Sequence, residues 1–153
     1  MEHQPTIKAA RGPTPRRLWL VRSWHDWCFP GGDHPDNRIS AEARSRAEAQ
    51  LNAFVLGKWM ENEIDLKQLD PPDAEAWEIR TYFGAPVLRL FGWFPEPLVY
   101  VVTNCAIRDD LEGPMWDRAI QQVATVRRQI LPGVPLFHGH SFTHYVGHGG
   151  DSD

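Results

Sequence analysis

The spacing of apolar residues changes once along this chain, from a period near 3.6 to a period of two. Between residues 43 and 59 the apolar positions recur at helical spacing, at Ala43, Ala47, Leu51, Phe54, Val55 and Trp59. Ser40 is a suitable N-cap, so the pattern predicts a helix from about residue 40 to 60. After residue 75 apolar and polar residues alternate, which predicts strands over 76–82, 87–94 and 98–104.

Short turns join these predicted strands. The connections at 83–86 and 95–97 contain proline, and connections this short join antiparallel neighbours. A further helix is predicted from Pro114 to a stop at 132–133. The order of elements therefore predicts an α+β fold class, with a small antiparallel curled β-sheet and helices packed on one face.

The two ends of the chain differ in composition from its centre. A chain of 153 residues has room for one domain, and both ends are polar and rich in proline or glycine. A short strand is predicted within 17–29, and a short helical piece is predicted over 64–69, before Pro71. We expect a flexible N-terminal arm over 1–16, a single α+β domain over 17–135 and a His/Gly-rich C-terminal tail over 136–153.

Composition excludes several classes of protein. No run of about 18 apolar residues is present, so no membrane-spanning helix is expected. The polar start of the chain does not resemble a secretory signal. Two cysteines, Cys28 and Cys105, cannot form a disulfide framework or a four-cysteine zinc site. With a net charge of −4, the chain is not a general polyanion binder, and we expect a cytoplasmic protein without membrane or DNA contact of its own.

The predicted hairpin brings two arginines opposite each other. If residues 83–86 close the first hairpin, Arg80 pairs with Arg89 and Glu78 pairs with Phe91. Two facing arginines repel unless an anion compensates them, and Glu78 or a phosphate backbone could do so. Extending the register across the second hairpin pairs Phe91 with Tyr100. One open face would then hold Glu78, Arg80 and Arg89, with Tyr82, Phe91, Trp93 and Tyr100 as platforms for stacked bases.

Three segments carry a family resemblance. They are Trp-Glu-Ile-Arg-Thr at 77–81, Val-Leu-Arg-Leu-Phe-Gly-Trp-Phe at 87–94 and Pro-Met-Trp-Asp-Arg-Ala-Ile at 114–120. In this order, and over about residues 38–131, the chain resembles the RelE/ParE superfamily of type II toxin–antitoxin toxins. The similarity is greatest to the HigB-like and phage-derived branch.

The resemblance implies a ribosome-dependent mRNA endonuclease that a cognate antitoxin silences. Its partners would be that antitoxin, the ribosome and mRNA, and it would need no cofactor. Arg80 and Arg89 match family arginines that stabilise the phosphate during attack by the 2′-hydroxyl. Arg108 alone stands where the family usually has two lysines, and Arg118 is placed to line an RNA or antitoxin groove. The alternative is a non-catalytic, prophage-derived RelE-fold binding protein that uses the same aromatic face for a protein partner.

The histidines near the C-terminus offer further chemistry. Four of them, at 138, 140, 144 and 148, lie among glycines. If this segment folds back on the sheet, His140 and Tyr145 could supply acid–base chemistry. The segment lacks a partnering cysteine or carboxylate, so we expect no metal site. His25 and Cys28 would point to opposite sides of an extended chain, so we expect the segment 24–28 to serve aromatic packing.

Overall fold

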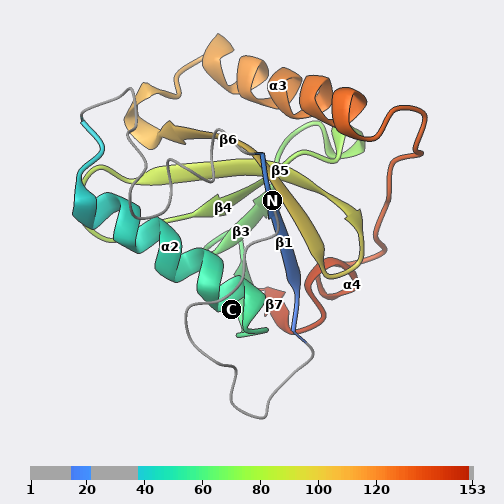
Figure 1. Cartoon of the computed structure of the whole chain (residues 1–153), viewed down its shortest axis with the longest axis horizontal. Coiled ribbons are helices and arrows are strands. Elements are labelled where there is room, and N and C mark those ends of the chain that lie inside the picture. The colour runs from blue at the N-terminus through green and yellow to red at the C-terminus, as the bar shows by residue number, and fades with distance from the viewer. Residues whose placement is uncertain (1–14, 22–37, 152–153) are drawn as a thin grey trace.

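A computed structural model describes residues 15–21 and 38–151 as an α+β fold built on one curled, mixed sheet (Figure 1). The seven strands lie in the order β1-β6-β5-β4-β3-β2-β7. They are β1 (Arg17–Leu20), β2 (Met60–Asn62), β3 (Leu66–Gln68), β4 (Trp77–Arg80), β5 (Leu88–Glu96), β6 (Val99–Ile107) and β7 (Gly149–Asp151). The helices are α2 (Ala41–Val55), α3 (Pro114–Ile130) and α4 (Phe142–Val146), with short 3-10 turns η1 (Pro72–Ala74) and η2 (Arg108–Asp110).

Local sequence signals define both long helices. The side chain of Ser40 accepts a hydrogen bond from the backbone N–H of Ala43, which confirms the predicted N-cap of α2. This helix ends at Val55, several residues earlier than predicted, since Gly57 turns the chain with a φ of 72°. Helix α3 begins at Pro114, as predicted.

The predicted helical piece over 64–69 is wrong. These residues contain β3, which pairs antiparallel with β4 and places Leu66 opposite Ile79. Leu66 is fully buried in the core, and Lys67 on the opposite parity pairs with Glu78. Packing against the neighbouring strand therefore overrides the weak helical pattern of this short segment.

The first hairpin has the predicted register, and the second does not. Arg80 lies opposite Arg89, and Glu78 lies opposite Phe91. On strand β6, however, Phe91 lies opposite Asn104 rather than Tyr100. Irregularities in the ladder, one of them between Phe91 and Gly92, shift the register. A Cβ atom at Gly92 would lie 1.9 Å from the carbonyl oxygen of Val101, so glycine is required where the strands approach this closely.

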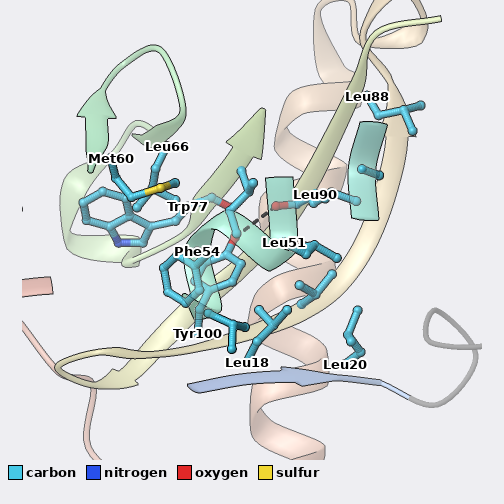
Figure 2. Close-up of a cluster of buried hydrophobic side chains, with 14 of the residues drawn as sticks. Leu18, Leu20, Leu51, Phe54, Met60, Leu66, Trp77, Leu88, Leu90 and Tyr100 are labelled. Atoms are coloured by element: carbon cyan, nitrogen blue, oxygen red, sulfur yellow. Dashed lines mark hydrogen bonds between the residues drawn. The ribbon is translucent and has the colours of Figure 1, made fainter. Parts of the chain in front are cut away.

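Helices cover both faces of the sheet, so the prediction of helices on one face is wrong (Figure 1). Helix α2 packs on a large cluster that includes Leu51, Phe54 and Tyr100, part of which Figure 2 shows. Helix α3 covers the other face, where Ala119 and Val123 pack against a second cluster. Strand β5 is consequently buried on both sides, which explains its almost continuous run of apolar residues.

The C-terminal segment belongs to the domain and is not a separate tail. Tyr145 and Val146 of α4 are buried in the same cluster as α2. Strand β7 then pairs parallel with β2, with Gly149 opposite Met60. The predicted boundary at residue 135 is therefore wrong, because the segment supplies core side chains and an edge strand. Residues 1–14 of the predicted N-terminal arm lie outside the described residues, and so does the segment 24–28.

One buried arginine ties the ends of the described chain together. The Arg16 guanidinium is 2% exposed and donates to four backbone carbonyl oxygens. These belong to Val146 at 2.6 Å, Phe54 at 2.9 Å, and Lys58 and His148 at 2.8 Å each. Burial lowers the pKa of Arg16 to about 10, so the guanidinium remains charged at neutral pH. The start of β1, the end of α2 and the C-terminal segment therefore depend on one side chain.

Replacing Arg16 with methionine should lower the free energy of unfolding by about 3 kcal/mol, because four carbonyl oxygens, in two buried and two partly buried hydrogen bonds, lose their donor. Urea unfolding followed by circular dichroism measures this change. Arg128→Met, an exposed arginine on α3, is the matched control and should change the stability by less than about 0.5 kcal/mol. Equal stabilities of the two variants would contradict the assigned role of Arg16.

Candidate functional site

A buried carboxylate lies between the two facing arginines. Glu78 of β4 is 2% exposed, and its Oε1 atom lies 3.4 Å from Nε of Arg80 and 3.5 Å from Nε of Arg89. The sequence left two anions that could compensate the arginines, Glu78 or a phosphate backbone. In the described structure the Glu78 carboxylate does so. The repulsion between the arginines is offset inside the protein.

The second oxygen of Glu78 has no such partner. Its Oε2 atom is buried and accepts no hydrogen bond from the described residues. Burial raises the pKa of Glu78, while the nearby charges of Arg89, Arg80, Lys67 and Arg108 oppose that rise. A carboxylate with raised proton affinity and an unoccupied oxygen has the properties of a general base.

Glu78 lines a hollow of about 290 Å³ on the α3 side of the sheet, here called the Glu78 hollow. Its cationic wall consists of Lys67, Arg80 and Arg108. The Arg108 guanidinium lies over the ring of Trp116, 5.4 Å from its centre. The remaining lining residues are Leu69, Asp70, Trp116, Asp117 and Ile120. The hollow thus combines charged groups of both signs with one aromatic ring.

Arg89 does not line this hollow, so its predicted contact with phosphate is not supported. Its side chain is buried, and Nη1 donates to the carbonyl oxygens of Thr81 and Leu88 at 3.1 Å each. Burial is the main cause of a lowered pKa for Arg89, and the charge of Glu78 opposes it. Arg89 therefore provides a buried positive charge 3.5 Å from the Glu78 carboxylate and does not face the hollow.

Three of the four predicted stacking rings are inaccessible. Phe91 and Trp93 are buried beneath α3, and Tyr100 points to the opposite face of the sheet. The Tyr100 hydroxyl lies within hydrogen-bonding distance of the Leu90 and Trp77 carbonyl oxygens, at 3.0 and 3.1 Å (Figure 2). The prediction is wrong for these rings because it left α3 off this face and misjudged the β5–β6 register.

The other predicted RNA contacts lie outside the Glu78 hollow. Tyr82 is 47% exposed and donates its hydroxyl to Asp65, but it lines a different hollow beside α2. Arg118 is exposed on α3, where it donates to the sulfur of Met115.

His140 and Tyr145 belong to a second hollow of about 480 Å³, called the Glu75 hollow. Tyr145 packs on Trp77, with ring centres 4.5 Å apart, on the α2 face of the sheet. Trp77 and Glu78 are neighbours in one strand and project to opposite faces. The predicted grouping of His140 and Tyr145 with the arginines is therefore wrong.

Two groups of this second hollow were not predicted. Glu75 is buried, and its Oε1 atom lies 2.9 Å from Nδ1 of His138. The cluster of four histidines pointed toward this segment, whereas no local pattern in the sequence marks Glu75.

Comparisons of the chain with family models, curated proteins and solved structures give no match. Chemistry must therefore be inferred from the geometry of the two hollows. Within residues 15–21 and 38–151, no three His, Cys, Asp or Glu side chains gather as a metal-ligand set. The helices in the same ranges are too short or too polar to cross a lipid bilayer.

Replacing Glu78 with alanine should lower the free energy of unfolding by about 3–5 kcal/mol, because Arg89 would remain buried without its counter-charge. The double variant Glu78→Leu with Arg89→Met removes both charges and should recover most of that loss. Guanidinium unfolding of the single and double variants tests the pair. A double variant as unstable as Glu78→Ala would contradict the assigned coupling.

Proposed function

We propose that this chain is an endoribonuclease that cleaves mRNA on the ribosome as the toxin of a type II toxin–antitoxin system. One observation carries the proposal: the buried Glu78 carboxylate, with an unoccupied oxygen, lines a hollow beside three cationic side chains. The resemblance of residues 38–131 to RelE/ParE toxins is the ground for naming the ribosome and an antitoxin as partners.

The reaction requires a base and a cationic environment for the phosphate. The Glu78 carboxylate, which lines the hollow, removes the proton from the ribose 2′-hydroxyl, and the resulting oxygen attacks the adjacent phosphorus. A bond forms between the 2′-oxygen and phosphorus while the bond from phosphorus to the 5′-oxygen breaks. The leaving 5′-oxygen takes a proton from solvent, and the other product ends in a 2′,3′-cyclic phosphate.

The cationic wall of the hollow stabilises the charge that develops on the phosphate. Lys67, Arg80 and Arg108 line the hollow together with Glu78, so in this proposal they contact the phosphate beside the base, although Asp70 and Asp117 also line the hollow and balance their charge. Arg80 is held in place, since Nη1 donates to the carbonyl oxygen of Glu63 and Nε lies near Glu78. Preorganised cations lose little free energy to reorientation during the reaction.

The hollow offers one aromatic ring on which a nucleobase next to the scissile phosphate can stack. Trp116 of α3 lines it, and Ile120 and Leu69 extend the apolar surface. Trp116 thus replaces the buried rings of β5 and β6 as the stacking platform in this proposal. A platform with a single ring fits a single-stranded substrate.

The alternative of a non-catalytic binding protein finds less support. It requires the aromatic sheet face to be open to a protein partner. Phe91 is 0% exposed and Trp93 is 2% exposed, and α3 covers both.

Replacing Glu78 with glutamine should reduce mRNA cleavage by about 100-fold or more, because the amide cannot accept the 2′-proton. Arg108→Ala and Lys67→Ala should each reduce cleavage by about tenfold through lost phosphate contacts. Cleavage is measured by primer extension on mRNA bound to translating ribosomes, and growth arrest on induction provides a second readout. Arg128→Ala, an exposed change elsewhere on α3, is the matched control and should cleave like the wild-type protein.

Folded Glu78→Gln protein that cleaves mRNA at the wild-type rate would refute the role of Glu78. Absence of cleavage and growth arrest with the wild-type protein would refute the proposed function.

As the pH falls, cleavage activity should decline at a higher pH than it would with an ordinary glutamate as the general base. This decline is the acid limb of the pH profile. Only ionised Glu78 can accept the proton, and burial raises the pKa of Glu78, so activity is lost earlier as pH falls. The charges of Arg89 and Lys67 lower this pKa, so Lys67→Met should move the limb to still higher pH. The pH dependence of kcat/KM measures both positions. A limb that does not move in Lys67→Met would argue against Glu78 as the titrating base.

A further inference from the structure

The Glu75 hollow shares only Lys67 with the lining of the Glu78 hollow and has its own charged centre. Glu75 is 4% exposed and adopts a left-handed backbone conformation with a φ of 50°. A residue other than glycine rarely adopts this conformation, which costs of order 1 kcal/mol. The fold therefore holds a buried carboxylate at a position that is unfavourable for the backbone.

Four side chains surround the Glu75 carboxylate. The Tyr145 hydroxyl lies 2.9 Å from both oxygens, and Nδ1 of His138 lies 2.9 Å from Oε1. Trp77 and Gln68 donate to Oε2 at 3.3 Å each. Burial raises the pKa of Tyr145 to about 12, so its hydroxyl remains a donor at neutral pH. The carboxylate is fully occupied, which leaves it the role of orienting its neighbours.

The neighbour that remains accessible is His138. Its side chain is 57% exposed and lines the hollow. A carboxylate only accepts hydrogen bonds, so Nδ1 of His138 is the donor, and the tautomer with its proton on Nδ1 offers the lone pair of Nε2 to a ligand. Gly139 supports this arrangement, since its N–H donates to the Tyr145 hydroxyl at 2.7 Å. A Cβ atom at Gly139 would lie 2.4 Å from the Tyr145 ring, so only glycine fits there.

The lining of the hollow restricts the ligand. Three carboxylates, Glu63, Asp73 and Glu75, outnumber the single lysine, Lys67, which disfavours a phosphate group. Asn62, Gln68 and Ser141 add hydrogen-bonding groups of both kinds, and Phe142 adds an apolar ring. A volume of about 480 Å³ lies within the range of small-molecule sites. This combination fits a neutral molecule with several hydroxyl groups.

We propose that the Glu75 hollow is a second ligand site, in which Nε2 of His138 accepts a hydrogen bond from a vicinal diol of a neutral small molecule. Ribonucleosides and monosaccharides share this chemistry. The proposal does not rest on RNA cleavage, because His138 and Glu75 line the Glu75 hollow and not the Glu78 hollow, although Lys67 lines both.

Nitrogen-15 NMR of the histidine rings in the full chain tests the site. The probes are adenosine, D-mannose and 2′,3′-dideoxyadenosine, which lacks the diol. We expect a saturable shift of the His138 Nε2 resonance with adenosine, with D-mannose or with both, and none with dideoxyadenosine. A shift with adenosine alone identifies a nucleoside site, and a shift with D-mannose identifies a site for sugars.

Variants separate ligand binding from structure. His138→Gln should weaken binding of the active diol, followed by backbone amide shifts, by about tenfold. His148→Gln is the matched control, because His148 packs against Trp59 outside the hollow. The proposal is overturned if neither diol shifts the His138 resonance, if dideoxyadenosine shifts it equally, or if His138→Gln binds like the wild-type protein. None of these results depends on nuclease activity.

Discussion

The attraction between one buried carboxylate and two arginines permits the central hairpin to exist in its observed register. Strands β4 and β5 place Arg80 directly opposite Arg89, an arrangement that repels by itself. Glu78 lies between the two guanidinium groups, and its burial raises its pKa. The burial that places Glu78 between the arginines thus raises its proton affinity, although the charges of the two arginines oppose that rise. The position of Glu78 therefore matters both for the stability of the hairpin and for its proposed role as a general base.

Elements with strong local signals could be predicted from the sequence. The cap at Ser40, the start of α3 at Pro114 and the pairing of Arg80 with Arg89 all follow from side chains close in the chain. The second hairpin could not be predicted in the same way. Its register depends on a bulge at Gly92, which the approach of the Val101 backbone imposes, and no local pattern encodes that contact.

The sequence placed some of the predicted site residues together and misplaced others. Arg80 and Arg108 do line one hollow, although they come from different elements. The stacking role of Phe91, Trp93 and Tyr100 failed because apolar residues on both faces of a sheet predict burial on both sides, and α3 supplies the second cover. Glu75 and His138 escaped prediction because 63 positions separate them in the chain, and their contact exists only when the C-terminal segment folds back.

The hydrogen bonds of Arg16 limit when the fold can be completed during synthesis of the chain. Its guanidinium reaches carbonyl groups 130 and 132 positions further along the chain. During synthesis those acceptors do not exist until residues 146 and 148 have been added. The sheet therefore cannot gain its last strand, nor Glu75 its partners His138 and Tyr145, while the chain is growing. These contacts therefore form only after residues 138–151 have left the ribosome that synthesises the chain.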